Sequence, residues 1–570
     1  MIQRTIRRRE CQIGEGWPDS VPPLLRRIYA ARGAHDPQQA QPRLANLLPP
    51  DSLGGLAQAT ALLADAIARD RHIVVVGDFD CDGATACAVG VRGLRMLGAA
   101  HVSYAVPNRI VHGYGLSPAL VDELAALRPD LLVTVDHGIA CHAGIAAAMA
   151  RGWQVLVTDH HLPGDRLPPA DAIVNPNLRG DAFPSKMLAG VGVIFYVLLA
   201  LRRHLRVTGA LAGCEPDLTA LLDLVAVGTV ADLVPLDANN RAFVAAGLRR
   251  LRAGQGCAGL HALIEVSGRE APRLTAADIG YALAPRINAA GRLEDMALGI
   301  ECLLTDDARQ ARELATVLHG INAERQGLQQ NMVDDAEALL AKAGISDEIL
   351  PSALCLFDPE WHPGVVGLVA SKLKERTHRP TVAFAPAEPG SGLLRGSARS
   401  IPGFHIRDAL AAVDAAHPGL IEKFGGHAMA AGLALSLDAL PAFASAFRAH
   451  AEAMLDAALL QSVLLSDGEL VATDFNRATA EALRDGGPWG QAYPEPLFDG
   501  EFDVLSWRIV GERHLKLEVA CGTLRLNAIH FGGWHNQPPP PRLRLAYRLA
   551  PDDYRGGQAI QLIVEHGEAL

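Results

Sequence analysis

The stretch His72-Ile73-Val74-Val75-Val76-Gly77-Asp78-Phe79-Asp80-Cys81-Asp82-Gly83 joins a short apolar run to three alternate carboxylates. The apolar part is β-branched and unbroken, which is typical of a strand buried on both faces of a parallel sheet. Because alternate residues of an extended segment point the same way, we expect Asp78, Asp80 and Asp82 to face one cavity. A single Asp before Gly is commonly a turn or a helix cap, but three at one strand end favour a metal site.

Two later stretches repeat the pattern. Residues 131–135 run into Asp136-His137-Gly138, and residues 155–158 run into Asp159-His160-His161. The carboxyl ends of parallel strands gather at one edge of a sheet, so we expect these side chains to meet there. Left bare, the carboxylates would repel and raise each other's pKa, and divalent cations would relieve that repulsion.

Mixed carboxylate and imidazole ligands suit Mn²⁺, with Mg²⁺ and Zn²⁺ as alternatives. Two such ions ~3.5–4 Å apart would activate water for in-line attack on phosphorus. Asp136, alone at its strand end, is our choice for the carboxylate that bridges them. A further apolar run ends in Gly228-Thr229-Val230-Ala231-Asp232, which by itself indicates only a buried helix ending in a polar turn.

Composition limits the classes of protein that this chain can be. A length of 570 residues predicts two to four domains, and a net charge of −11 argues against non-specific wrapping of duplex DNA. The nine cysteines are scattered without a CxxC pair, which favours reduced thiols in a cytoplasmic protein. We expect no secretory signal and no membrane span, and a monomer is the default expectation.

Periodicity predicts an α/β protein of several parts. Alternating strands and helices across residues 51–305 indicate a parallel-sheet domain, preceded by a helical segment over 1–50. Expected helices include residues 83–97, 117–127 and 141–151, and expected strands include 101–106 and 172–174. Residues 306–345 predict a long connecting helix, 346–457 a second α/β domain, and 458–570 a small β-barrel such as an OB-fold.

Aromatic residues alternate with arginines in the barrel segment. Trp507, Phe531, Trp534 and Tyr547 would suit base stacking beside phosphate contacts. Alternatively, these rings fill the barrel core and the arginines form a solvated face. The sequence leaves both interpretations open.

The four acidic motifs, in this order, resemble those of the DHH phosphoesterase superfamily, which is named for a triplet like Asp159-His160-His161. Within it the chain is similar to the RecJ family of single-strand-specific exonucleases. The resemblance implies that Asp80, Asp136 and Asp78 hold one metal. It implies that Asp82, Asp136, His160 and Asp232 hold the other, with His161 beside them. Many relatives carry His where this chain has Val76, so Asp78 would substitute for it or the first metal site would be weaker.

The second half of the chain carries matching segments, including Pro285–Arg292, and residues 352–455 resemble the DHHA1 domain. Glycines there would let the backbone approach a phosphate closely. The resemblance implies a pocket for a 5′-terminal phosphate and the groups beside it, formed by Arg109, Arg286, Asn288, Ser397, Arg399 and His427. Arginine suits this task because its planar fork donates two hydrogen bonds, although a lone surface arginine is as commonly part of a salt bridge.

Together these features predict a two-metal 5′-to-3′ exonuclease that cuts single-stranded DNA to 5′-mononucleotides in recombination and repair. Resemblance also implies work beside a helicase and single-strand-binding protein. One alternative is a phosphodiesterase for short oligoribonucleotides or cyclic dinucleotides, although such chains generally lack the barrel. A manganese pyrophosphatase is a weaker alternative. A RecJ-like replication scaffold without catalysis is a third, although such proteins typically lack several ligands.

Overall fold

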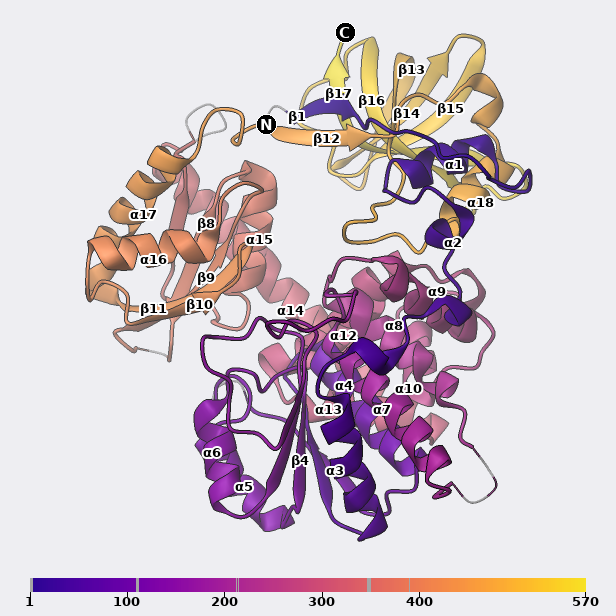
Figure 1. The fold of residues 1–570 in the computed structure, drawn as a ribbon. Helices are drawn as coiled ribbons and strands as arrows, with labels where there is room; N and C mark the ends of the chain where they lie inside the picture. Colours follow the sequence, from indigo (N-terminus) through magenta and orange to yellow (C-terminus); the bar gives the residue numbers. More distant parts are fainter. Residues whose placement is uncertain (1–3, 109–111, 212, 214, 346–349, 389) are drawn as a thin grey trace.

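The computed structural model describes residues 4–108, 112–211, 213, 215–345, 350–388 and 390–570. They form a parallel-sheet unit, a second α/β unit and a closed barrel (Figure 1). The long helix α14 (Ala308–Lys342) joins the first two units. Asp307 caps the N-terminus of α14, within the range predicted for the connecting helix. The 35 residues of α14 extend ~50 Å.

The first unit is built on five parallel strands in the order β3-β2-β4-β5-β6. The strands are β2 (Ile73–Val76), β3 (Val102–Ala105), β4 (Leu131–Val135), β5 (Gln154–Thr158) and β6 (Ala172–Val174). Helices α5 (Pro118–Leu124) and α6 (His142–Ala150) pack on one face, and α3 (Leu56–Ala68), α4 (Cys81–Met96) and α7 (Gly190–Val207) pack on the other. Both faces are therefore covered, which explains why the strands are continuously apolar.

More helices complete this unit beside α7. They are α8 (Leu222–Ala231), α9 (Ala238–Arg252), α10 (Ala258–Val266), α11 (Ala276–Asp278), the π-helical turn η6 (Ile279–Leu283), α12 (Ala284–Leu293) and α13 (Ala297–Leu304). Helix α5 begins within the predicted range 117–127, where Ser117 caps it by accepting a hydrogen bond from the Leu120 amide and Pro118 follows at the first helical position.

The second unit carries a five-stranded mixed sheet in the order β10-β11-β9-β8-β7. Its strands are β7 (Leu354–Phe357), β8 (Thr381–Pro386), β9 (Leu393–Arg399), β10 (Lys423–Gly426) and β11 (Ala430–Ser436). Its helices are α15 (Val366–Thr377), α16 (Ile406–Ala416) and α17 (Leu440–Met454). Phe384, Phe443 and Phe447 are fully buried in its core.

The C-terminal barrel closes in the order β13-β14-β15-β17-β16, which confirms the predicted OB-like architecture. Its strands are β13 (Phe498–Val510), β14 (His514–Cys521), β15 (Leu524–His530), β16 (Arg542–Pro551) and β17 (Ile560–Ala569). Helix α18 (Arg477–Asp485) precedes them. None of the helices in the described part of the chain is long and apolar enough to span a bilayer.

The N-terminal segment differs from the helical segment that the sequence predicts. Helices α1 (Pro23–Ala30) and α2 (Pro37–Ala40) are present, but strand β1 (Arg4–Arg8) comes first and pairs in parallel with β12 (Ser462–Ser466). Figure 1 shows β1 lying against the barrel. The N-terminal segment thus belongs in space to the C-terminal part of the chain, a pairing that local periodicity cannot indicate.

Candidate metal centre

The three acidic strand ends meet at the edge where the sheet order changes direction. From β2 the chain passes outward to β3, and it then returns to β4 and β5 on the other side of β2. Asp136 and Asp159 follow β4 and β5 directly, and Asp78 follows β2 after Gly77. This change of direction is the usual ligand-binding crevice of an open parallel sheet.

The first motif reaches the site by a different route from the one that alternation predicts. Helix α4 already begins at Cys81, and Asp80 is its N-cap, accepting a hydrogen bond from the Gly83 amide at 3.0 Å. Asp82 therefore lies in the first helical turn rather than on an extended segment. Its carboxylate accepts hydrogen bonds from the amides of Gly190 (2.6 Å) and Val191 (3.0 Å) at the start of α7.

Asp136 occupies a strained and crowded position. Its φ is +64°, a conformation that costs a non-glycine residue free energy and that clusters at functional sites. A Cβ on Gly190 would lie 2.5 Å from both Cβ and Oδ1 of Asp136, so only glycine fits there. The start of α7 thus contacts both Asp82 and Asp136.

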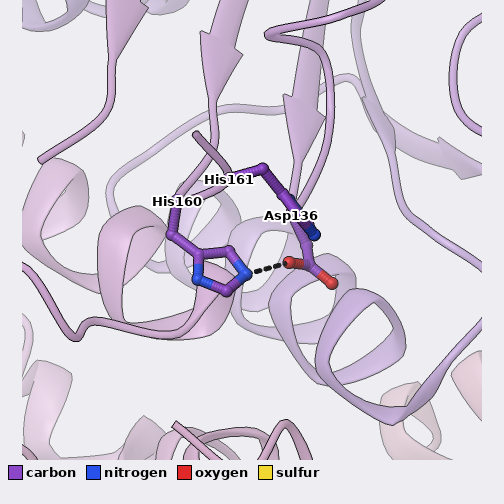
Figure 2. A group of neighbouring side chains, drawn as sticks. All are labelled: Asp136, His160 and His161. Carbon is purple, nitrogen blue, oxygen red and sulfur yellow. Dashed lines mark ion pairs between the residues drawn. The ribbon is translucent and has the colours of Figure 1, made fainter. Parts of the chain in front are cut away.

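Figure 2 shows the imidazole of His160 directed at the carboxylate of Asp136, where Nε2 lies 3.1 Å from Oδ1. The same Nε2 lies 3.5 Å from Oδ2 of Asp232, which caps the C-terminal end of α8. Asp232 therefore joins the site from a helix end, although its own sequence context indicated only a polar turn.

Ligand atoms within 4.8 Å of one another form three groups: Asp78 with Asp80 and Asp136, Asp82 with His160 and Asp232, and Asp136 with His160 and His161. Asp136 belongs to two of the three groups. The first two groups match the two ligand sets that the sequence implies, if Asp136 is shared between them.

The donor set fits divalent cations. Asp136 Oδ1 and His160 Nε2 are buried and make no hydrogen bond within the described residues. Burial, together with repulsion from Asp80, raises the pKa of Asp82 to about 7. Burial and the neighbouring carboxylates, Asp82 first, raise the pKa of Asp136 and Asp232 well above the usual range. A cation of the Mn²⁺ or Mg²⁺ type would remove this repulsion and use the free lone pairs.

Asp159, which the sequence analysis did not select, orients the histidine pair. Its carboxylate accepts hydrogen bonds from the amides of Ile139, His160 and His161 and from the ring of His161, at 2.7 to 3.0 Å. Burial opposes charge on both partners, but the mutual hydrogen bond raises the pKa of His161 to about 9 and lowers that of Asp159. The hydrogen bond to Asp159 thus orients the ring of His161 beside the metal ligands and favours its protonated form.

The comparisons with known proteins agree with this geometry. Three family models match: the DHH family N-terminal domain over residues 72–229, the DHHA1 domain over 350–453 and the RecJ OB domain over 466–566. The chain is 51% identical to a single-stranded-DNA-specific exonuclease RecJ from Dickeya dadantii over 96% of both chains. It is 48% identical to the Escherichia coli protein of that name over 99% of both.

The chain belongs to the RecJ family. A crystal structure of Thermus thermophilus RecJ in complex with Mn²⁺ matches it with a TM-score of 0.79 and 33% identity, over 97% of this chain and 76% of that one. A Mg²⁺ complex of the same protein matches with a TM-score of 0.74 and 30% identity, over 97% and 75%. A relative that binds either ion agrees with the donor set described above.

Side chains from both α/β units of this chain lie beside the candidate metal centre. The ring of His161 stacks on that of His427, which follows β10 in the second unit. Tyr114 makes edge contacts with His161 and Phe79. Sequence reasoning missed Phe79 and Tyr114, although Phe79 sits between two of the acidic residues of the first motif.

The residues proposed for the 5′-phosphate pocket are partly brought together. Ser397 and Arg399 lie on β9, and a Cβ on Gly367 of α15 would lie 2.9 Å from Arg399 Nη2 and 3.4 Å from Ser397 Oγ. Arg286 instead contacts His319 of α14 at 3.0 Å. Asn288 accepts a hydrogen bond from the Cys81 amide at 2.9 Å, so it supports the first metal motif. Arg109 lies outside the described residues.

The barrel separates the four aromatic residues that the sequence proposed for base stacking. Trp507 and Trp534 stack on each other 5.5 Å apart, and Phe531 is exposed beside His514. Tyr547 is only 1% exposed and packs in the barrel core, so its selection for stacking was wrong. The alternative interpretation, core filling, applies to Tyr547 because β16 turns this position inward.

Proposed function

We propose that this chain is a metal-dependent exonuclease that degrades single-stranded DNA from its 5′ end and releases 5′-mononucleotides. The observation that carries the proposal is the set of four aspartates and one histidine, buried or half-buried, around Asp136, in a chain whose RecJ relatives are named as single-stranded-DNA-specific exonucleases. Two bound divalent cations would stabilise charge on the scissile phosphate and lower the pKa of the attacking water.

We propose that the residues divide this work as follows. Asp78, Asp80 and Asp136 hold one cation, and Asp82, Asp136, His160 and Asp232 hold the other. The sequence raised the possibility that Asp78 takes the place of the His that Val76 replaces, and the grouping of Asp78 with Asp80 and Asp136 supports it.

His161 and His427 act on the substrate side of this metal set. Asp159 orients the ring of His161 and favours its protonated form, in which it would donate a hydrogen bond to the phosphate. His427 approaches from the opposite unit and closes the site over the strand.

Polarity would come from a pocket that recognises the 5′-terminal phosphate. Ser397 and Arg399 support this, because they lie together beside the N-terminal end of α15, where backbone amides favour an anion. Burial lowers the pKa of Arg399 below its usual value, because the guanidinium is shielded from water. A bound anionic phosphate would stabilise its charge. Arg109, Arg286 and Asn288 remain proposed members of this pocket.

The barrel would extend the track along which the strand runs. Trp507, Phe531 and Trp534 remain proposed stacking residues there, and Trp507 and Phe531 are exposed. A phosphodiesterase of short oligoribonucleotides or cyclic dinucleotides would have no need of this unit. All of the implied ligands except the one replaced by Val76 are present, which disfavours a non-catalytic scaffold.

We also infer the wider setting of the enzyme. Action in recombination and repair, with single-strand-binding protein and a helicase as partners, follows from family membership, and a monomer remains our proposal. A cytoplasmic location is supported by the described cysteines, all of which are free thiols. We propose domain limits of 1–50, 51–305, 306–345, 346–457 and 458–570, with β1 associated with the last of these.

End-labelled single-stranded DNA tests the proposal. The enzyme is incubated with substrates that carry or lack a 5′ phosphate, in the presence of Mn²⁺, Mg²⁺ or a chelator. We expect metal-dependent release of the 5′ label first, as mononucleotide, with faster cleavage of the phosphorylated strand. Release of the 3′ label first, or faster cleavage of dinucleotides than of long strands, would contradict the proposed polarity or substrate.

A further inference from the structure

A tyrosine outside every motif considered so far is almost completely exposed close to the metal centre. Tyr281 has 85% of its surface exposed, whereas its neighbours in the same turn, Ile279, Ala282 and Leu283, are buried. It lies on η6, between α11 and α12, in one continuous helical stretch. The turn is therefore firmly anchored, and its one large ring points into solvent.

The chemistry of proline explains this geometry. Pro285 lies four residues after Tyr281, and the ring of a proline inside a helix clashes with the carbonyl four residues before it. The helix widens into a π turn over these residues, which avoids that clash. Turns of this kind are frequent at functional sites. The widening is thus centred on the residue that carries the exposed ring.

The same helical stretch is tied to the metal centre. Asn288, seven residues after Tyr281, binds the amide of Cys81 in the first acidic motif. Asn288 lies in the same helical stretch, so the two residues are ~10 Å apart along the helix axis. A Cβ on Gly280 would lie 3.6 Å from Val230 of α8, the helix that Asp232 caps.

The surroundings suit an anionic strand with exposed bases. Leu233, directly after Asp232, is also largely exposed, which adds apolar surface on the side of α8 that η6 contacts. Arg286 follows Tyr281 on the same helical stretch and supplies positive charge. On the barrel side, Arg273 lies 3.6 Å from Asp553, so the segment just before η6 contacts the barrel. Along the chain, Tyr281 thus lies between a segment that contacts the barrel and a residue that contacts the first acidic motif.

We propose that Tyr281 is a stacking platform for a base of the single-stranded substrate as the strand enters the metal centre. The inference rests on the proposed function and extends it to a residue that positions long substrates. A dinucleotide, which ends at the metal centre, would not reach this ring.

The test is fluorescence anisotropy of a labelled 5′-phosphorylated oligonucleotide in a chelator, so that binding is measured without cleavage. Tyr281→Ala is expected to weaken binding roughly 5- to 100-fold, the range measured for loss of one base–aromatic stack. Tyr281→Phe keeps the ring and should bind like the parent. Hydrolysis of a dinucleotide by the Ala variant with Mn²⁺ should be unchanged. Val207→Ala, 80% exposed at the C-terminal end of α7, is the control and should bind like the parent.

Parental affinity in Tyr281→Ala would overturn the inference, as would an equal loss in Tyr281→Phe, which would assign the effect to the hydroxyl group. An equal loss of dinucleotide hydrolysis would also overturn it, since it would indicate a disturbed metal centre. If the parent itself neither binds nor cleaves single-stranded DNA, the proposed function fails first, and this inference fails with it.

Discussion

The imidazole of His161 lies stacked on the imidazole of His427, with ring centroids 6.0 Å apart and 24° between the ring planes. The two residues are 266 positions apart in the sequence and belong to different α/β units. Asp159 orients the ring of His161 through a hydrogen bond. The stacking of His427 on this ring brings the second unit against the metal ligands. Both units therefore contribute side chains to the candidate site.

Removal of His427 should therefore impair turnover without removing the metals. We expect His427→Ala to lower kcat roughly 100-fold, the scale for losing one group that stabilises transition-state charge. Mn²⁺ affinity by calorimetry should be unchanged, because His427 belongs to none of the ligand groups in the described part of the chain. His417→Ala, exposed at the end of α16, is the control. A normal kcat in His427→Ala would contradict this role.

The contact between Gly190 and Asp136 predicts a steric loss of the metal centre. Gly190→Ala places a Cβ 2.5 Å from Asp136 and disturbs the start of α7, which binds Asp82. We expect activity to fall by at least roughly 100-fold and Mn²⁺ affinity to fall with it. Gly192 lies two residues further along the same helix. In Gly192→Ala the nearest atom to the new Cβ is the flexible end of Leu188 at 3.3 Å, so this variant should keep most activity. Equal activity in the two variants would show that the close approach is unimportant.

Asn288 should act through the backbone of the first motif. In Asn288→Ala the Cys81 amide loses its acceptor, and the start of α4, with Asp80 and Asp82, becomes less fixed. Loss of such a supporting contact typically costs ~10- to 100-fold in metal affinity. Calorimetric titration with Mn²⁺ measures it, with Gln330→Ala on the exposed side of α14 as the control. Unchanged metal affinity with weaker DNA binding would contradict this supporting role and would indicate that Asn288 only binds substrate.

The N-terminal strand should stabilise the barrel through a buried carboxylate. Arg8 of β1 and Arg544 of β16 bind Asp499 at 2.9 and 2.8 Å. Arg8→Ala should lower the free energy of unfolding by ~1–3 kcal/mol, since it removes a charge-assisted hydrogen bond. Arg7→Ala, on the opposite side of the same strand, should have little effect. Equal stability of the two variants in urea would contradict the assignment.

The same carboxylate predicts an acid dependence of stability. Burial opposes its charge, but the hydrogen bonds from Arg8, Ser466 and Arg544 lower the pKa of Asp499 to about 2. The pKa in the unfolded chain is ~3.9, so the stabilisation is fully present above that value and is lost as the pH falls towards 2. Urea unfolding between pH 5 and pH 3 should therefore show a smaller difference between parent and Arg8→Ala at the lower pH. A constant difference would contradict this linkage.

Much of the metal centre could be predicted because parallel strands place their ends together. The apolar runs before Asp78, Asp136 and Asp159 identify buried strands. Because these strands pair in parallel, their carboxyl ends lie at one edge of the sheet. The alternation argument was nevertheless wrong for Asp82, because helix α4 begins at Cys81. Three carboxylates still converge, since a helix start and a strand end are both directed at the same edge.

The remaining features depend on contacts between residues far apart in the sequence. Strand β1 pairs with β12, more than 450 residues later, and nothing in residues 4–8 indicates that partner. Gly190 could be recognised only once α7 was placed against Asp136. Tyr547 was selected by composition, but the barrel register turns it inward. Long-range packing, rather than local propensity, decides each of these cases.

The central claim is that the cluster around Asp136 hydrolyses single-stranded DNA with bound divalent cations. The most direct test compares the parent with Asp136→Ala on a 5′-phosphorylated, end-labelled single strand in Mn²⁺, with strand binding measured in parallel by anisotropy. We predict that Asp136→Ala abolishes release of mononucleotides and leaves strand binding close to that of the parent. Near-normal cleavage by Asp136→Ala would contradict the account, because no metal centre of this design can work without the carboxylate that two of its ligand groups share.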